Sequence, residues 1–150
     1  MRMNERFKFR AWDIINRKMY KCAGFLSGQV IIIEDDGKVL GKNDEGFILM
    51  QFTGLKDKNG KEIYEGDLVR TIITIKKDEP GSRSRKDISV GTVIFKEGEY
   101  LPRNILNENW YSTIQTIDCW EGDYEPAIHR TSSVEVIGNT YENLELILKG

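Results

Sequence analysis

The segment Gln51–Val69, QFTGLKDKNGKEIYEGDLV, brings three turn signals into one short stretch. Asn59-Gly60 is the strongest of them, because a type I′ hairpin turn requires a positive φ at both central residues. Thr53-Gly54 precedes this pair, and Glu65-Gly66-Asp67 follows it and leads directly into a strand-like run. We therefore interpret the segment as the joint between two sets of β-strands.

Upstream of the joint, short strands alternate with polar turns. Apolar and polar residues alternate over Phe7–Trp12, with Phe7, Phe9 and Ala11 on one face, which is typical of a half-buried strand. Phe47–Phe52 is apolar on both faces and predicts a central strand covered on both sides. The other predicted strands and turns of this half are Asp13–Lys18 (a turn in which Asp13 and Asn16 bond the local backbone), Met19–Cys22, Gln29–Glu34, the turn Asp35–Lys38, and Val39–Leu40.

Downstream of the joint, a β-branched run over Leu68–Ile75 predicts a long strand. Lys76–Asp87 is polar and contains Pro80-Gly81, so we expect an exposed, mobile loop there. Ile88–Phe95 then pairs back against the first strand, and Gly91 in its interior suggests a bulge or a sharp bend. The later predicted elements are Tyr100-Leu101, one or two strands in Trp110–Trp120, the strand Val134–Ile137 and a single helical turn capped by Asn143.

Many short strands separated by turn signals indicate an all-β chain. In the second half, a Gly-Asp turn, a long strand, a variable loop and a Gly-containing strand that ends at Phe95 resemble an SH3-like barrel, which bends its strands at glycines and bulges. We therefore predict an N-terminal β region, 1–53, packed on an SH3-like barrel domain, 54–150.

Composition narrows the class of protein. The 22 basic and 24 acidic residues give a formal net charge of -2, which argues against a dedicated duplex-DNA binder because such proteins usually carry a net basic footprint. Cys22 and Cys119 form no CxxC pair, so we expect reduced thiols, with a long-range disulfide as the alternative.

The longest apolar run, Val30–Ile33, is far too short to cross a membrane, and the charged N-terminus precedes no apolar run. We expect a cytoplasmic protein without a membrane partner.

Several sequence blocks stand out: Phe9–Asp13 with Lys18–Tyr20, the long block Met50–Val69, Gly91–Phe95, and Glu135–Asn143. Together they resemble the YopX-like proteins encoded by bacteriophages and prophages of Gram-positive bacteria, and they extend over almost the whole chain. One departure is Leu144, where the family often has proline. The resemblance implies a β-rich, self-associating protein with an SH3-type barrel in its C-terminal part. It implies no activity and no functional residues.

Asp57, Asn59 and Gly60 suggest a calcium-binding loop. If Gly60 takes the place of the invariant glycine, the first and last ligand positions fall on Leu55 and Gly66, which supply no carboxylate. A hairpin turn is therefore the better interpretation of these residues.

Glu65, Asp67 and His129 are the candidates for catalysis. The two carboxylates could share a proton or a cation if they faced one way on a strand, whereas in the plainer interpretation Asp67 bonds turn amides and Glu65 is solvated. His129, the single histidine, could pair with Cys22 or Cys119, but neither cysteine has an activating neighbour. Histidines and cysteines are too few for a zinc site. A hydrolase built on Glu65, Asp67 and His129 is one hypothesis.

The polar loop carries a run of basic residues that could hold phosphates, with aromatic residues elsewhere as stacking platforms. The basic residues are Lys76, Lys77, Arg83, Arg85 and Lys86, and the aromatic ones are Trp110, Tyr111, Trp120 and Tyr124. Asp78, Glu79 and Asp87 interrupt the run, which favours a solvated loop. No Gly-rich phosphate loop with a following Lys and Ser or Thr occurs in the chain.

We expect no catalytic, cofactor-binding or metal site. The first hypothesis is a non-enzymatic phage or prophage accessory protein that forms homo-oligomers and binds another macromolecule, such as a protein. The alternative is a nucleic-acid-binding module that uses the barrel face and the basic loop 76–87.

Overall fold

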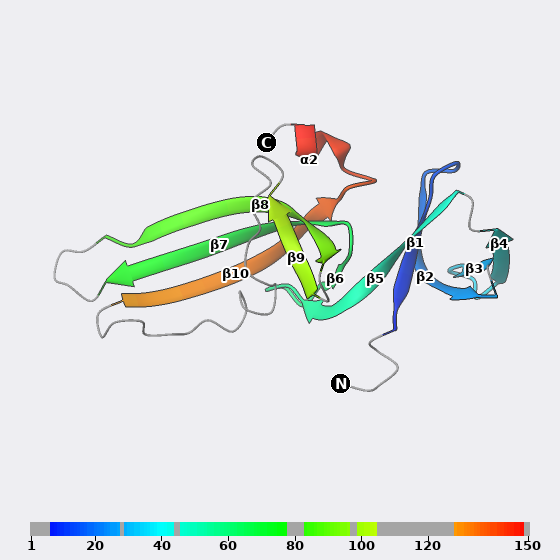
Figure 1. Cartoon of the computed structure of the whole chain (residues 1–150), viewed down its shortest axis with the longest axis horizontal. Helices are drawn as coiled ribbons and strands as arrows, with labels where there is room; N and C mark the ends of the chain where they lie inside the picture. The colour runs from blue at the N-terminus through cyan, green and yellow to red at the C-terminus, as the bar shows by residue number, and fades with distance from the viewer. Residues whose placement is uncertain are drawn as a thin grey trace. The chain divides into compact units, whose positions relative to one another are not determined.

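The computed structural model describes residues 7–27, 29–43, 46–77, 83–96, 99–104 and 128–148. These residues lie mostly in two antiparallel β-sheets, so the predicted all-β class is confirmed (Figure 1). The chain divides into two compact units. Unit 1 comprises Met1–Gly54 and Glu62–Glu65, and unit 2 comprises Leu55–Lys61 and Gly66–Gly150. The domain limits 1–53 and 54–150 and the SH3-like closure of the second half stay predictions.

Unit 1 is built on a six-stranded sheet with the order β4-β3-β2-β1-β5-β6. Strands β1 to β4 form a meander, and β5 adds to the free side of β1. Ala11, Val30 and Ile32 are fully buried at its core and pack against half-buried aromatic and aliphatic side chains. The strands are β1 (Phe9–Asp13), β2 (Lys18–Leu26), β3 (Gln29–Ile33), β4 (Val39–Asn43), β5 (Phe47–Lys56) and β6 (Glu62–Tyr64).

The first strand departs from the predicted alternation. Phe7 precedes β1 and is 68% exposed, whereas Ala11 and Trp12, which are neighbours in sequence, are both buried. The register of β1 against β2 shifts between Phe9 and Ala11, and this irregularity interrupts the two-residue period. The prediction that Phe7 shares a buried face with Phe9 and Ala11 is therefore wrong.

The turn between β1 and β2 forms as its polar residues predict. Asp13 is buried, and its Oδ1 accepts hydrogen bonds from the backbone N–H groups of Ile15 and Asn16 at 3.0 and 2.9 Å. Asn16 bonds the other Asp13 oxygen through its side-chain amide at 2.8 Å. The carboxylate thus satisfies donors that the end of the strand would otherwise leave without partners.

Unit 2 is built on a four-stranded sheet with the order β10-β7-β8-β9. Three of its strands run side by side over most of their length, while β9 pairs only with residues 91–96 of β8 (Figure 1). We call the three-stranded part, β10-β7-β8, the ribbon. The elements are β7 (Asp67–Lys77), β8 (Arg85–Lys96), β9 (Glu99–Asn104), β10 (Ile128–Asn139) and the short helix α2 (Leu144–Leu148).

The strands of the ribbon are longer than predicted. β7 continues to Lys77 and β8 begins at Arg85, so the predicted loop 76–87 is wrong at both ends. Lysine and aspartate have a low intrinsic preference for strands. Here the pairing partners outweigh that preference, because β7 is hydrogen-bonded to β8 on one side and to β10 on the other.

Of the two alternatives predicted at Gly91, a bulge or a sharp bend, the bulge is wrong. The register of β8 runs through Gly91 without a shift against both β7 and β9, although Figure 1 shows that β8 curves along its length. The bulge of this sheet lies in β10, at Ile137, between Val136 and Gly138. An extra residue at Gly91 would interrupt two strand pairings at once, whereas in β10 it interrupts the pairing with β7 alone.

The chain that follows β10 is fixed by asparagine side chains. Asn139 is buried, and its Oδ1 accepts hydrogen bonds from the N–H groups of Tyr141 and Glu142 at 3.0 and 2.9 Å. Asn143 directly precedes α2, as predicted for a cap, and its backbone oxygen accepts a hydrogen bond from Leu146. Its side chain instead accepts the N–H of Asn139 at 3.2 Å. The predicted Trp110–Trp120 strands lie outside the described residues.

This packing leaves no room for a side chain at residue 138. A Cβ at Gly138 would lie 2.6 Å from Oδ1 and 3.1 Å from Cβ of Asn143. We expect Gly138→Ala to lower the free energy of unfolding by about 1–3 kcal/mol, because the whole Asn143 side chain must move. Gly24→Ala is the matched control, since a Cβ there meets nothing within 4 Å. Urea unfolding of both variants tests this, and equal stabilities would contradict it.

Candidate functional site

The joint segment forms a tight hairpin around Asp57. The N–H of Gly60 donates to the Asp57 oxygen at 2.9 Å, and the N–H of Asp57 donates to the Lys61 oxygen at 2.8 Å. Gly60 has a φ of +80°, but the only described non-glycine residues with positive φ are Arg17 and Ser27. Asn59 is therefore not left-handed, and the predicted type I′ turn is wrong. A β-turn followed by a left-handed glycine is the observed arrangement.

The same turn closes a second hairpin, between β3 and β4. The N–H of Gly37 donates to the Glu34 oxygen, the N–H of Glu34 donates to the Lys38 oxygen, and Gly37 has a φ of +83°. The spacing of the acidic residue, glycine and lysine is identical in the two hairpins. This geometry is therefore a general solution for such sequences, and what distinguishes the Asp57 hairpin is its buried carboxylate.

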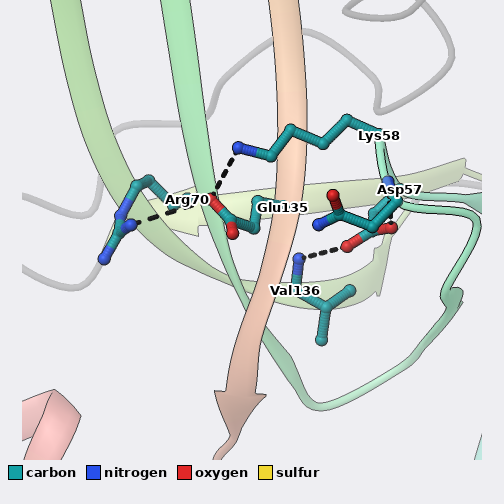
Figure 2. A network of polar contacts seen from close by, with 6 residues as sticks. Asp57, Lys58, Arg70, Glu135 and Val136 are labelled. Carbon is teal, nitrogen blue, oxygen red and sulfur yellow. Dashed lines mark hydrogen bonds and ion pairs between the residues drawn. The ribbon is translucent and has the colours of Figure 1, made fainter.

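The carboxylate of Asp57 joins its hairpin to the outer edge of β10. Its Oδ1 accepts hydrogen bonds from the N–H groups of Asn59 and Lys61 at 2.8 and 2.9 Å, and its Oδ2 accepts one from Val136 at 3.0 Å (Figure 2). The N–H of Lys58 donates to the oxygen of Val134 at 3.0 Å. Because Asp57 is only 7% exposed, these bonds are shielded from water. The hairpin thus covers backbone groups that an edge strand would expose.

Charged side chains surround this contact and neutralise one another. Lys58 reaches across β10, and its Nζ lies 2.9 Å from Oε2 of Glu135, while Nη1 of Arg70 lies 3.7 Å from the same oxygen (Figure 2). All three side chains are partly exposed, at 28–44%, so their pairing contributes less than about 1 kcal/mol per contact. The buried carboxylate of Asp57, rather than this ion-pair cluster, holds the hairpin to β10.

The hydrogen bonds of Asp57 also set its protonation. Burial by itself would raise the pKa of the Asp57 carboxyl, but bonds from the amides of Val136, Lys61 and Asn59 favour the charged form. The bonds outweigh burial, so the pKa lies below its ordinary value of 3.8. Asp57 is therefore ionised at neutral pH.

At the other end of the ribbon, the strand register gathers basic residues. We call this part the distal end: the rungs 74–77 of β7 with residues 85–86 of β8 and 128–131 of β10. Thr74 pairs with Lys86, Ile75 lies between Arg85 and Arg130, and Lys76 pairs with His129. Four of the five predicted basic loop residues thus lie in strands, and β10 adds Arg130 and the single histidine, His129, which lie more than forty residues away in the sequence.

The structure separates the residues of the hydrolase hypothesis. Glu65 and Asp67 do not share a strand, because β6 ends at Tyr64, β7 begins at Asp67 and Gly66 between them has a φ of +79°. His129 pairs with Lys76, nine residues from Asp67 along β7, which corresponds to about 30 Å. Asp67 and His129 cannot meet at one site, so the hydrolase hypothesis is wrong.

The structure describes only some of the remaining candidate residues. Cys22 lies in β2, opposite Ile33, whereas Cys119 and the predicted stacking residues Trp110, Tyr111, Trp120 and Tyr124 lie outside the described residues. Within the described ranges, no group of three His, Cys, Asp or Glu side chains is arranged to hold a metal ion. None of the helices in those ranges combines the length and apolar character that a membrane crossing requires.

Sequence reasoning missed the contact between Asp57 and β10. It interpreted Asp57 only as a turn residue, and 79 positions separate Asp57 from Val136. One signal was available: an acidic residue three positions before glycine, in a hairpin that already has a strong turn signal, is a natural acceptor for backbone amides. Which distant amide it accepts depends on the pairing of strands and not on local sequence.

Comparison with known proteins identifies relatives over most of the chain. The family model described as "YopX protein" matches residues 8–148. A solved structure, the crystal structure of protein EF1440 from Enterococcus faecalis, is similar with a TM-score of 0.54 and 24% sequence identity, covering 93% of this chain and 96% of that one. At that identity the likeness concerns the fold alone. No curated protein is significantly similar to this chain.

Asp57→Ala is expected to lower the free energy of unfolding by about 2–4 kcal/mol, because three amides lose a charged acceptor and the Val136 N–H becomes buried without a partner. Asp36→Ala is the matched control. Asp36 is an exposed hairpin aspartate that accepts a single local bond, from Lys38, so its loss should cost less than about 1 kcal/mol. Urea unfolding measures both, and equal losses would contradict the role of Asp57.

The stability contributed by Asp57 should depend on pH. Because the folded-state pKa lies below the unfolded-state value of 3.8, the contribution is complete well above that value and is lost as the pH falls through the folded-state pKa. The difference in unfolding free energy between the wild type and Asp57→Asn should therefore shrink from about pH 7 to about pH 3. Urea titrations at several pH values test this, and a constant difference would refute it.

Proposed function

The chain belongs to the YopX protein family, and from that premise we propose that it is a non-enzymatic accessory protein that self-assembles and binds another macromolecule. The observation that carries the proposal is the edge of the unit 1 sheet, where apolar side chains lie beside an open strand. Self-assembly uses this edge, and binding of the other macromolecule uses unit 2.

The edge strand β4 offers backbone groups for a further strand. Among the described residues, β4 pairs only with β3, and it forms one end of the six-stranded sheet. The outward N–H and C=O groups of an edge strand are a template for pairing with another chain. In β10 the equivalent edge is covered by the Asp57 hairpin at Val134 and Val136. The chain thus protects one sheet edge by its own structure, and β4 lacks the equivalent cover among the described residues.

Exposed apolar side chains lie on β4 and at the same end of the sheet. Val39, in β4, is 62% exposed, and its direct cross-strand partner Ile33 is 39% exposed. At the same end of the sheet, the turn between β1 and β2 presents Ile14 and Ile15, which are 50% and 80% exposed. Apolar residues that gather in this way mark interaction sites.

We infer that a second copy of the chain occupies this edge. Two β4 strands pair antiparallel about a two-fold axis, so each copy supplies the same groups that it receives, as in most symmetric dimers. Pairing of the strands satisfies the open backbone groups, and the Val39–Ile33 surface is covered at the same time. One edge per chain therefore suffices for the homo-oligomer.

The non-enzymatic role is supported by the separation of the catalytic candidates. Asp67 and His129 lie at opposite ends of the ribbon, and the buried carboxylates Asp13 and Asp57 are occupied by hydrogen bonds to turn and strand amides. We propose further that unit 2 is an SH3-like barrel. The sequence resemblance supports a phage or prophage origin and a place in the cytoplasm of the bacterial host.

Val39→Lys should dissociate the assembly into monomers, because a charged side chain on an edge strand opposes pairing with another chain. Ile88→Lys is the matched control: Ile88 is 63% exposed, but it lies in β8 of unit 2. Size-exclusion chromatography with light scattering at high micromolar concentration gives the mass of each variant. A monomeric wild type, or equal effects of the two substitutions, would contradict the proposal.

A further inference from the structure

The strand β8 has two neighbours along only part of its length. On one side it pairs with β7 from Arg85 to Thr92, whereas on the other side β9 pairs with residues 91–96 alone (Figure 1). Among the described residues, no strand continues β9 along residues 85–90. We call residues 85–90 the open half of β8. The outer edge of a strand offers a row of N–H and C=O groups to a further strand.

Apolar side chains lie beside this open half. Ile88, near its centre, is 63% exposed, and its direct cross-strand partner is the half-buried Ile72 of β7. Val90 is also half-buried, and it faces the same side of the sheet as Ile88 because side chains alternate along a strand. The open half thus combines backbone groups with an apolar surface, the two features that strand addition uses.

The regular pairing of β8 favours a polypeptide as the occupant. β9 already pairs antiparallel on this side, from Gly91–Asn104 to Lys96–Glu99 without a shift in register, so a second strand laid along the open half would continue an existing interface. The phosphates of nucleic acid only accept hydrogen bonds, and they leave the C=O groups of an edge without donors. An extended backbone supplies donors and acceptors in alternation.

The charge of Lys86 argues against a second copy of the chain as that polypeptide. Residues directly opposite each other in an antiparallel pair face the same side of the sheet. The side of the open half that carries the exposed Lys86 also carries Ile88 and Val90. In a pair of two open halves, Lys86 therefore meets Lys86, Ile88 or Val90 and never an acidic residue. A different polypeptide can place an acidic residue there, and opposite charges on neighbouring strands stabilise the pair.

We propose, resting on the macromolecular binding proposed for unit 2, that the macromolecule is a protein and that an extended segment of it adds antiparallel to the open half of β8. The segment carries apolar residues opposite Val90 and Ile88 and an acidic residue opposite Lys86. Backbone hydrogen bonds supply the affinity, and the alternate side chains supply the selectivity. The β4 edge in unit 1 serves self-assembly, so the two sites do not compete.

The test is an NMR titration of the isotope-labelled full chain with the peptide Val-Thr-Ile-Thr-Glu-Thr. In antiparallel pairing its Val, Ile and Glu fall opposite Val90, Ile88 and Lys86. We expect the largest shifts at the amides of the open half, and slower hydrogen exchange at every second one, because alternate N–H groups point outward. A control peptide with Pro-Pro in place of Thr-Ile loses two adjacent N–H groups and should bind at least about tenfold more weakly.

Charge reversal tests the predicted register. Lys86→Glu should bind the peptide about threefold to tenfold more weakly than the wild type does, and it should bind the same peptide with Lys in place of Glu more tightly by a similar factor. A substitution that merely disturbed the sheet would weaken both. Val39→Lys is the matched control, since Val39 is also exposed on an edge strand but lies in unit 1. It should keep the affinity for the peptide within about twofold.

Four results would overturn the inference: equal binding of the proline peptide, no recovery on charge reversal, slow exchange of all the open-half amides in the free protein, or larger shifts of these amides with duplex DNA than with the peptide. Light scattering on the same samples separates the two proposals. A wild type that assembles but does not bind the peptide would remove the strand partner and leave self-assembly in place.

Discussion

The carboxylate of Asp57 is the contact on which the organisation of unit 2 depends. It closes its own hairpin through Asn59 and Lys61 and holds Val136 of β10 with its second oxygen. Without this group the hairpin would still turn, as the Glu34–Lys38 hairpin does, but it would not be tied to a strand 79 positions away. A buried charge is tolerated only where its hydrogen bonds are satisfied, and three amides meet that condition here.

The two ends of the ribbon differ in how their backbone groups and charges are paired. Near β9, the ribbon is covered by the Asp57 hairpin and followed by the Asn139 turn and α2, so backbone groups and charges have partners within the chain. Toward the distal end, β9 no longer accompanies β8, and the rungs carry basic residues.

Much of the fold can be predicted from local sequence. β-branched runs give β3 and β7, and an acidic residue three positions before glycine gives both tight hairpins. The predictions of strand length fail because strand length depends on pairing with distant parts of the chain. β7 extends through Lys76 and Lys77 because β10 pairs with them. The turn at Asn59-Gly60 is a local exception: there, as at Glu34–Lys38, the left-handed glycine follows the β-turn and is not one of its two central residues. The basic positions of the site were recognisable from sequence, but their arrangement on three strands, with Arg130 among them, follows only from the register.

Hydrogen exchange at the Val136 amide tests the central role of Asp57 most directly. This N–H donates to the Asp57 carboxylate, so its protection reports that contact. In the wild type we expect Val136 to exchange as slowly as the β10 amides that pair with β7, and in Asp57→Ala we expect its protection alone among the β10 amides to be lost. Rapid exchange of Val136 in the wild type, at the rate of an exposed edge strand, would contradict the account.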